Sequence, residues 1–127
     1  MTIAYWCVLI AAYMPLIWTG VAKLTGTGFP PENNHNPREF METLGGYRKR
    51  AYWAQLNGLE AFPPFAAAVI IAHLAHAAQT TVDGLAIAFV ALRLVYGVLY
   101  LVDQPALRSA VWAAATACVF ALFIVAA

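Results

Sequence analysis

Four apolar stretches, each long enough to cross a lipid bilayer, dominate this sequence. They cover about residues 2–22, 50–78, 83–102 and 108–127, and polar or helix-breaking residues separate them. A helix needs about 20 apolar residues to span the hydrocarbon core. No alternation of apolar and polar residues appears, as a membrane β-barrel would require. The sequence therefore predicts an all-α fold, a transmembrane four-helix bundle that forms one domain over residues 1–127.

The composition supports a membrane location. Hydrophobic residues make up 63% of the 127 residues and charged residues only 10%. This number of charged residues is too small to cover the surface of a soluble domain of this size. The apolar residues must therefore face lipid. The formal net charge of +1 also argues against a nucleic-acid-binding protein, which would carry a basic face.

The connections between the apolar stretches predict how the chain is oriented. Residues 23–49 form one long polar loop rich in Gly, Pro and Asn, whereas the later connections are short and imply antiparallel neighbours. Six of the seven basic residues lie in the first or third connection or at its edges: Lys23, Arg38, Arg48, Lys49, Arg50 and Arg108. The positive-inside rule then predicts a cytoplasmic long loop and two periplasmic termini.

Several polar residues lie inside the apolar stretches, where charged groups are costly and usually have a function. Asn57 and Glu60 follow Arg50 at seven and ten residues, along one helix face. Arg93 lies inside the third stretch, with Tyr96 and Tyr100 on its face. At 1.5 Å per residue, Glu60 and Arg93 both lie roughly 13 Å deep. We therefore predict a direct hydrogen-bonded pair between their side chains.

The simplest interpretation of this pair is that it fixes the register of two helices. A second interpretation follows from the number of polar groups predicted in the cytoplasmic half of the bundle: Arg50, Asn57, Glu60, Arg93, Tyr96, Tyr100, Arg108 and Ser109. A cavity lined by these groups, open to the cytoplasm and rich in cationic donors, would suit a small anionic ligand.

Other features indicate packing rather than chemistry. His73 and His76 lie at the outer end of the second stretch without an evident third ligand, so we predict no metal site. Cys7 and Cys118 lie in apolar runs and are interpreted as buried, inert thiols.

Prolines predict irregularities in two helices. The Pro63–Pro64 pair should kink the second helix, and Pro15 should bend the first.

The motifs NPREF at residues 36–40 and RAYWAQLNGLEAFPPF at residues 50–65 resemble the membrane-associated proteins in eicosanoid and glutathione metabolism, the MAPEG family, and its bacterial branch in particular. The resemblance extends through RLVYGVLYLVDQPALRSAVW at residues 93–112. It implies a homotrimer in a bacterial inner membrane that binds glutathione between subunits near the cytoplasmic face. Family members conjugate glutathione to lipophilic electrophiles, reduce lipid hydroperoxides or isomerise lipid peroxides.

Carried over residue by residue, the resemblance assigns roles to the polar groups. Asn57 and Glu60 would hold glutathione, and Arg93 would brace Glu60. The binding set implied in this way is Arg50, Asn57, Glu60, Arg93, Tyr96 and Tyr100. Arg108 and Ser109 match an arginine–serine pair near the thiol, where a guanidinium would favour the nucleophilic thiolate.

The sequence departs from the family pattern at several positions. Trp53 and Leu56 stand where the eicosanoid enzymes carry arginines, Trp112 replaces a tyrosine, and the spacing from Tyr100 to Arg108 is about one residue shorter. Fewer cations weaken the case for tight glutathione binding. Two alternatives to a glutathione-dependent enzyme therefore stay open: a membrane protein that binds a lipid or small anion, and a non-catalytic scaffold.

Overall fold

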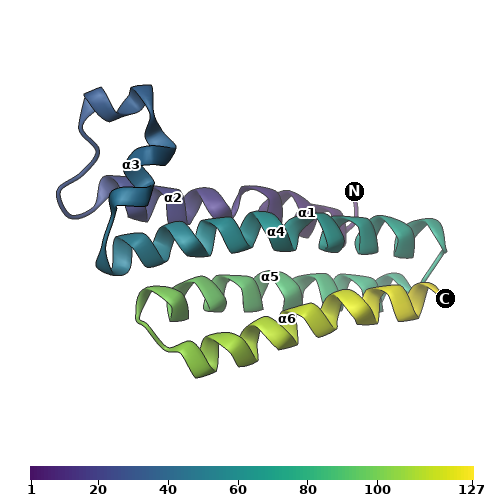
Figure 1. Cartoon of the computed structure of the whole chain (residues 1–127). Coiled ribbons are helices and arrows are strands. Elements are labelled where there is room, and N and C mark those ends of the chain that lie inside the picture. Colours follow the sequence, from purple (N-terminus) through teal and green to yellow (C-terminus); the bar gives the residue numbers. More distant parts are fainter.

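The computed structural model describes all residues 1–127 and contains only helices as regular elements (Figure 1). Four helical spans are long and apolar enough to cross a membrane, which confirms the predicted all-α transmembrane bundle. They are Ile3–Leu24, divided into α1 (Ile3–Tyr13) and α2 (Pro15–Leu24), then α4 (Gly46–Leu74), α5 (Gln79–Leu101) and α6 (Pro105–Ala126). The connection between α2 and α4 holds the 3-10 helix η1 (Pro31–His35) and the short helix α3 (Pro37–Thr43).

The helix boundaries differ from those predicted, mostly at helix starts. α4 begins at Gly46, where a glycine with φ of +57° starts the helix before the basic cluster, and it ends at Leu74 rather than near residue 78. α5 begins at Gln79, whose side chain donates to Asp83 Oδ1 at 2.8 Å. α6 begins at Pro105, because proline suits the first helical position, where its missing N–H is not needed.

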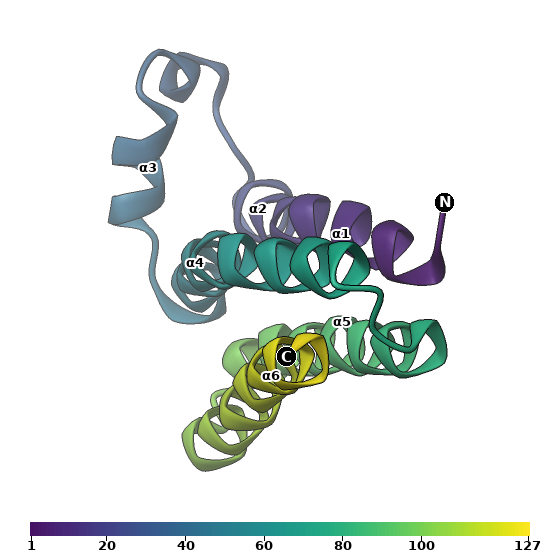
Figure 2. The ribbon, with the colours of Figure 1, turned by 90° about the vertical axis from the view of Figure 1, so that its right-hand side faces the viewer.

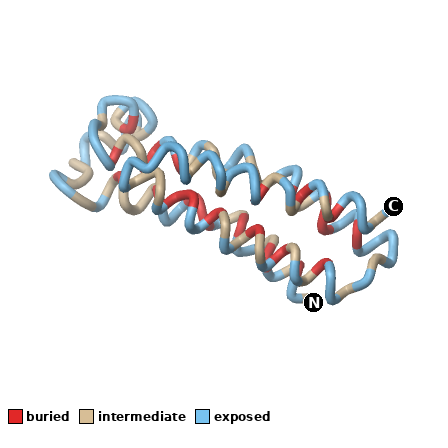
Figure 3. The backbone as a smooth tube through the Cα atoms, turned by 90° about the horizontal axis from the view of Figure 1, so that it is seen from below, coloured by how far each residue is buried: buried red, intermediate tan, exposed pale blue.

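The long helices pack as two layers, with α1, α2 and α4 in one and α5 and α6 in the other (Figure 2). Buried residues follow the inner sides of the helices (Figure 3), and the core includes the stacked rings of Phe65 and Phe89, whose centroids are 3.9 Å apart. Both termini lie at one end of the bundle and α3 lies at the other (Figure 1). The cytoplasmic or periplasmic identity of each end stays a prediction.

Two glycines allow close contacts between side chains of α2 and the helices α4 and α5. A Cβ added to Gly97 of α5 would lie 1.9 Å from the Trp18 ring of α2, and one added to Gly58 of α4 would lie 3.0 Å from Pro15. The missing side chain of Gly97 leaves room for the Trp18 ring, and that of Gly58 leaves room for the Pro15 ring. The α2 segment is thereby held against both α4 and α5.

The prolines act differently in the two helices. At Pro15 the helix is interrupted between α1 and α2, although Met14 between them keeps helical backbone angles and its N–H donates to the Ile10 carbonyl at 2.8 Å. α4, by contrast, continues through Pro63 and Pro64. Because proline has no N–H, these two residues cannot donate to the carbonyls of Leu59 and Glu60 one turn earlier.

Arg48, which the sequence placed among the loop charges, is buried and has a structural role. Its Nε donates to the Ala22 carbonyl at 2.8 Å, its Nη1 to Thr27 Oγ1 at 2.9 Å and its Nη2 to the Gly28 carbonyl at 2.8 Å. One guanidinium therefore caps the end of α2 and fixes the chain that follows it.

We expect Arg48→Met to increase the mobility of residues 22–28 without unfolding the bundle. The acceptors in this segment would lose the guanidinium donors and form hydrogen bonds with water instead. Limited proteolysis and amide hydrogen exchange should show faster cleavage and exchange in this segment. Arg38→Met is the control, since Arg38 is exposed and its side chain makes no hydrogen bond. Equal protection in both variants would contradict the role of Arg48.

A second polar contact holds α3 on the start of α4. The Tyr52 hydroxyl donates to Glu42 Oε1 at 2.8 Å, and Lys49 Nζ forms the only ion pair of the structure with Glu42 Oε2 at 3.1 Å. The hydrogen bonds from Tyr52 and Lys49 hold the pKa of the Glu42 carboxyl below its ordinary value. The predicted loop between the first two spans is thus partly helical and anchored.

Candidate functional site

A hydrogen-bonded chain joins the polar side chains of α4 and α5. Arg93 Nη2 donates to Asn57 Oδ1 at 2.8 Å, and Asn57 Nδ2 donates to Glu60 Oε2 at 3.3 Å. The predicted direct pair between Glu60 and Arg93 is wrong, because the Asn57 amide lies between them as acceptor for one and donor to the other. An amide can do both at once, which a carboxylate cannot.

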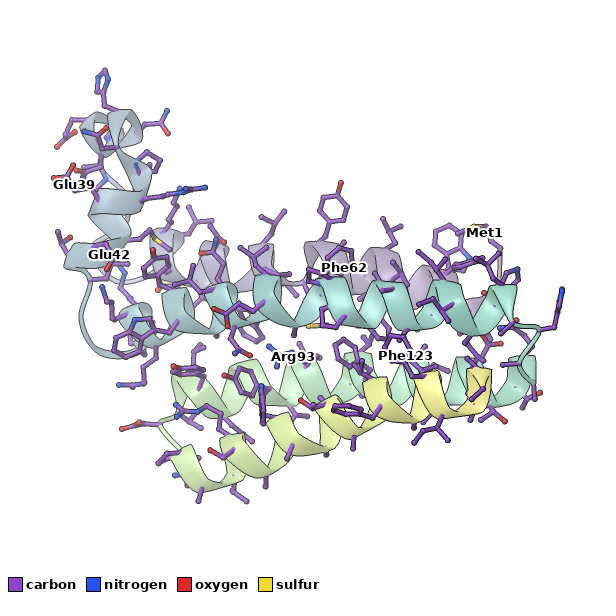
Figure 4. The ribbon with its side chains drawn as sticks, turned by 45° about the vertical axis from the view of Figure 1, so that its right-hand side comes forward. Met1, Glu39, Glu42, Phe62, Arg93 and Phe123 are labelled. Atoms are coloured by element: carbon purple, nitrogen blue, oxygen red, sulfur yellow. The ribbon has the colours of Figure 1, made fainter.

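Arg93 lies in the interior of the bundle, between α4 and α5 (Figure 4). Only 5% of its surface is exposed. Its guanidinium carbon lies 4.2 Å from the centroid of the Tyr96 ring, a cation–π distance. A guanidinium at this depth is stable only because the amide and the ring take the place of water.

The aromatic rings continue from Arg93 toward the cytoplasmic loops predicted for this end. Tyr96 meets Tyr100 edge to face, with centroids 5.7 Å apart, and the Arg108 guanidinium carbon lies 4.1 Å from the centroid of Tyr100. The Trp53 ring of α4 lies 6.3 Å from the ring of Tyr100. Two guanidinium groups thus lie at the two ends of a pair of tyrosines.

A cleft of about 400 Å³ opens on these groups between α4 and α5. It is lined by Trp53, Leu56, Asn57, Glu60, Tyr96 and Tyr100. Four of the predicted binding residues line this cleft, and Arg93 and Arg108 contact its walls. The cleft can offer a carboxylate, an amide and two hydroxyls to a ligand.

Two predicted site residues lie outside this group. Arg50 donates from Nε and Nη2 to the Leu101 carbonyl at 3.1 and 3.0 Å, so it caps the end of α5. Ser109 is exposed near the start of α6 and makes no side-chain hydrogen bond. The roles of both residues toward a ligand stay predictions.

A second cavity, which we call the apolar groove, lies between α4, α5 and α6 and has a volume of about 420 Å³. It is lined by Asn57, Glu60, Ala61, Pro64, Phe89, Arg93, Trp112, Ala115, Thr116, Val119, Phe120 and Phe123. Asn57 and Glu60 line both this groove and the cleft, so the two cavities meet at these residues. Sequence reasoning missed the groove because its walls come from three helices and are mostly ordinary apolar residues.

A third cavity of about 430 Å³ lies on the other side of Leu56, between α2, α3 and α4. Its lining includes Thr19, Lys23, Arg38 and Gln55. The Oε1 atom of Gln55 is buried without a hydrogen-bond partner, the only such side-chain atom in the structure. An amide within the apolar stretch 50–78 was the sequence signal that could have identified it.

The comparison with known families agrees with this architecture. Residues 3–127 match the family model described as the MAPEG family. Neither the curated proteins nor the solved structures contain a match to this chain. Because the family match covers essentially the whole chain, this protein belongs to the MAPEG family, a family of membrane proteins in eicosanoid and glutathione metabolism.

Proposed function

We propose that this protein is a membrane glutathione transferase or peroxidase-like enzyme that acts on lipophilic electrophiles or lipid hydroperoxides. The observation that carries the proposal is the connected set of polar side chains beside the cleft, from Glu60 through Asn57 and Arg93 to Tyr96, Tyr100 and Arg108. A structural pair of charges needs no cleft and no second guanidinium. Family membership supports glutathione as the ligand that such a set would hold.

Arg108 is the residue that we propose for activation of the thiol. Glutathione attacks electrophiles as the thiolate, and a nearby cation stabilises the charged sulfur relative to the neutral thiol. Arg108 is only half-buried over Tyr100, so its guanidinium is accessible from the cytoplasmic side proposed for this end. In a conjugation the thiol proton first passes to solvent; the thiolate sulfur then forms a bond to the electrophilic carbon while the bond from that carbon to its leaving group breaks, and the leaving group departs with the electron pair. The Ser109 hydroxyl would donate a hydrogen bond to the sulfur.

We further propose a homotrimer in a bacterial inner membrane, with the long loop cytoplasmic and both termini periplasmic. A ligand held between protomers needs polar groups on two surfaces. The cleft supplies one, and the cavity with Lys23, Arg38 and Gln55 is a second polar surface at the same end of the bundle.

One observation favours the alternative of a lipid- or small-anion-binding protein without glutathione chemistry. Trp53 and Leu56 line the cleft at the positions where related enzymes carry arginines. Calorimetric titration of glutathione into the purified protein in detergent separates the two functions. Enzymatic function predicts saturable binding, and its absence would favour the alternative.

We expect Arg108→Ala to lower turnover with glutathione and a model electrophile by at least about tenfold, which is about 1.4 kcal/mol in the barrier. Glutathione affinity should change less, because the attraction to the sulfur develops only when the thiol ionises. Arg108→Lys should keep part of the rate, since a point charge still favours the thiolate. Leu107→Ala, at an adjacent exposed residue that lines no cavity, serves as the control. Equal rates in wild type and Arg108→Ala would refute this role.

A further inference from the structure

The connection between α2 and α4 has the form of a strap, residues 29–44, which includes η1 and α3 and stands apart from both long helices (Figure 2). We propose that this strap opens and closes the third cavity to the aqueous phase, with the Glu42 carboxylate as the latch that keeps it closed. The opening itself does not depend on glutathione. It rests on the proposed function in one respect only, that the cavity would then hold part of the ligand.

The strap forms one wall of the third cavity. Pro37, Arg38 and Met41 of α3 line the cavity together with residues of α2 and α4. The lining on α4 runs from Tyr52 to Leu59, six to thirteen residues after the start of that helix, which is about 9 to 20 Å along it. α3 lies at the end of the bundle opposite the termini (Figure 1). A ligand that enters the cavity along α4 from this end must therefore pass α3.

Glycines lie at both ends of the strap. Gly28 precedes it with a φ of +76°, and Gly45 and Gly46 follow it, the second with a φ of +57°. No atom lies within 4 Å of a Cβ built on any of the three, so neighbouring groups do not restrain the backbone there. Arg48 holds the chain as far as the Gly28 carbonyl, so a movement would begin directly after this residue. Hinges of moving segments are a few such loop residues that take up a change in φ and ψ.

The strap has a contact of its own between its two parts. The rings of Phe29 and Phe40 meet edge to face, with centroids 5.0 Å apart, and this contact joins the start of the strap to α3. Residues 29–44 can therefore swing on the two hinges as one body, without unravelling.

One carboxylate provides the polar contacts between α3 and the bundle. Glu42 accepts the hydrogen bond from the Tyr52 hydroxyl and pairs with Lys49. Figure 4 shows Glu42 next to the start of α4 and Glu39 farther from the bundle. The ion pair contributes little because the carboxylate is exposed to water, whereas the bond from Tyr52 contributes more because that side chain is buried. A segment held by so few contacts can open without unfolding of the helices beneath it.

The same tyrosine belongs to the latch and to the cavity wall. Tyr52 lines the third cavity, and its hydroxyl holds Glu42 of the strap. A ligand that displaces the ring from the wall would move the hydroxyl away from Glu42 and release the strap, and return of the ring would allow closure. The position of α3 is thereby connected to what the cavity holds.

The test measures how fast a sulfonated, membrane-impermeant methanethiosulfonate labels the Gln55→Cys protein, purified in detergent and without glutathione. Gln55 lines the cavity, and mass spectrometry separates labelling at this position from any at Cys7 and Cys118. Adding Glu42→Ala removes both contacts of the carboxylate, so the cavity should be open more often and the labelling rate should rise at least about tenfold. Glu39→Ala is the matched control. It removes an exposed carboxylate of α3 that forms no hydrogen bond or ion pair, and it should leave the rate unchanged.

Two further measurements act on the same latch. Tyr52→Phe removes the hydroxyl and keeps the ring in the cavity wall, so it should give a smaller increase in the labelling rate than Glu42→Ala. A water-soluble carbodiimide can activate the Glu42 carboxylate, so that the Lys49 amine attacks it, an amide forms and a urea leaves. This link across the hinge should slow labelling below the rate of untreated protein, and the same treatment of the Glu42→Ala variant should not.

Equal labelling rates with and without Glu42→Ala would overturn the latch. If Gln55→Cys reacts as fast as Thr43→Cys, at an exposed position of α3, the strap does not cover the cavity and the proposal is wrong. Glutathione binding together with equal labelling rates would overturn the strap and leave the proposed function standing. Faster labelling of the Glu42→Ala variant of a protein that does not bind glutathione would support the strap and overturn the proposed function alone.

Discussion

Replacing Gly97 by alanine should destabilise the bundle by about 3 kcal/mol or more, because the new methyl group would occupy the space of the Trp18 ring. The built Cβ lies 1.9, 2.3 and 2.6 Å from three atoms of that ring. The ring is rigid and only 6% exposed, so it cannot rotate away without displacing α2 from α5. Unfolding of the purified protein by a denaturing detergent, followed by circular dichroism, measures the loss.

Gly84→Ala is the matched control for Gly97→Ala, since Gly84 is on the same helix and nothing lies within 4 Å of its built Cβ. Alanine is a better helix former than glycine by about 1 kcal/mol, so this variant should be as stable as wild type or slightly more so. If both variants unfold at the same detergent fraction, α2 and α5 do not pack as closely as described.

The second large effect is expected for Asn57→Ala, which should destabilise the protein by about 3 kcal/mol because it leaves the Arg93 guanidinium buried without its hydrogen-bonded acceptor. Arg93 makes its one side-chain hydrogen bond with this amide. Glu60→Gln should cost less than about 1 kcal/mol, because Glu60 is exposed and contacts Asn57 rather than Arg93. The same unfolding measurement applies.

A double variant tests whether the cost of Asn57→Ala comes from the stranded charge. Replacing Arg93 by methionine together with Asn57→Ala removes the buried charge and its partner at once, so the double variant should be more stable than Asn57→Ala alone. A larger loss for Glu60→Gln than for Asn57→Ala would indicate that the carboxylate, and not the amide, pairs with Arg93.

The polar residues of the candidate site could be predicted from the sequence as a set but not as contacts. Periodicity along each helix placed Asn57 with Glu60 and Arg93 with Tyr96 and Tyr100, and the structure brings the two groups together. The contact across the helices was predicted between the wrong partners. Matched depth along two helices leaves the rotation of each helix free, and this rotation decides whether the amide or the carboxylate meets the guanidinium.

The contacts of the basic residues could not be predicted from the sequence either. Arg48 and Arg50 look alike in the sequence, as members of one cationic cluster next to an apolar stretch. In the fold, Arg48 binds the chain after α2, and Arg50 binds the last carbonyl of α5. Their partners lie 20 to 51 residues away, so no local pattern could indicate them.

By itself, the sequence determined the number and approximate position of the membrane spans. A bilayer offers no hydrogen bonds to the backbone, so a stretch of about 20 apolar residues has to be a helix whatever lies around it. Only the tertiary structure showed that the Trp18 ring packs against Gly97 and that the Asn57 amide lies between Glu60 and Arg93. It also showed the groove between α4, α5 and α6. These features depend on how side chains from separate helices pack, whereas the spacing of residues along one helix fixes only which of them share a face.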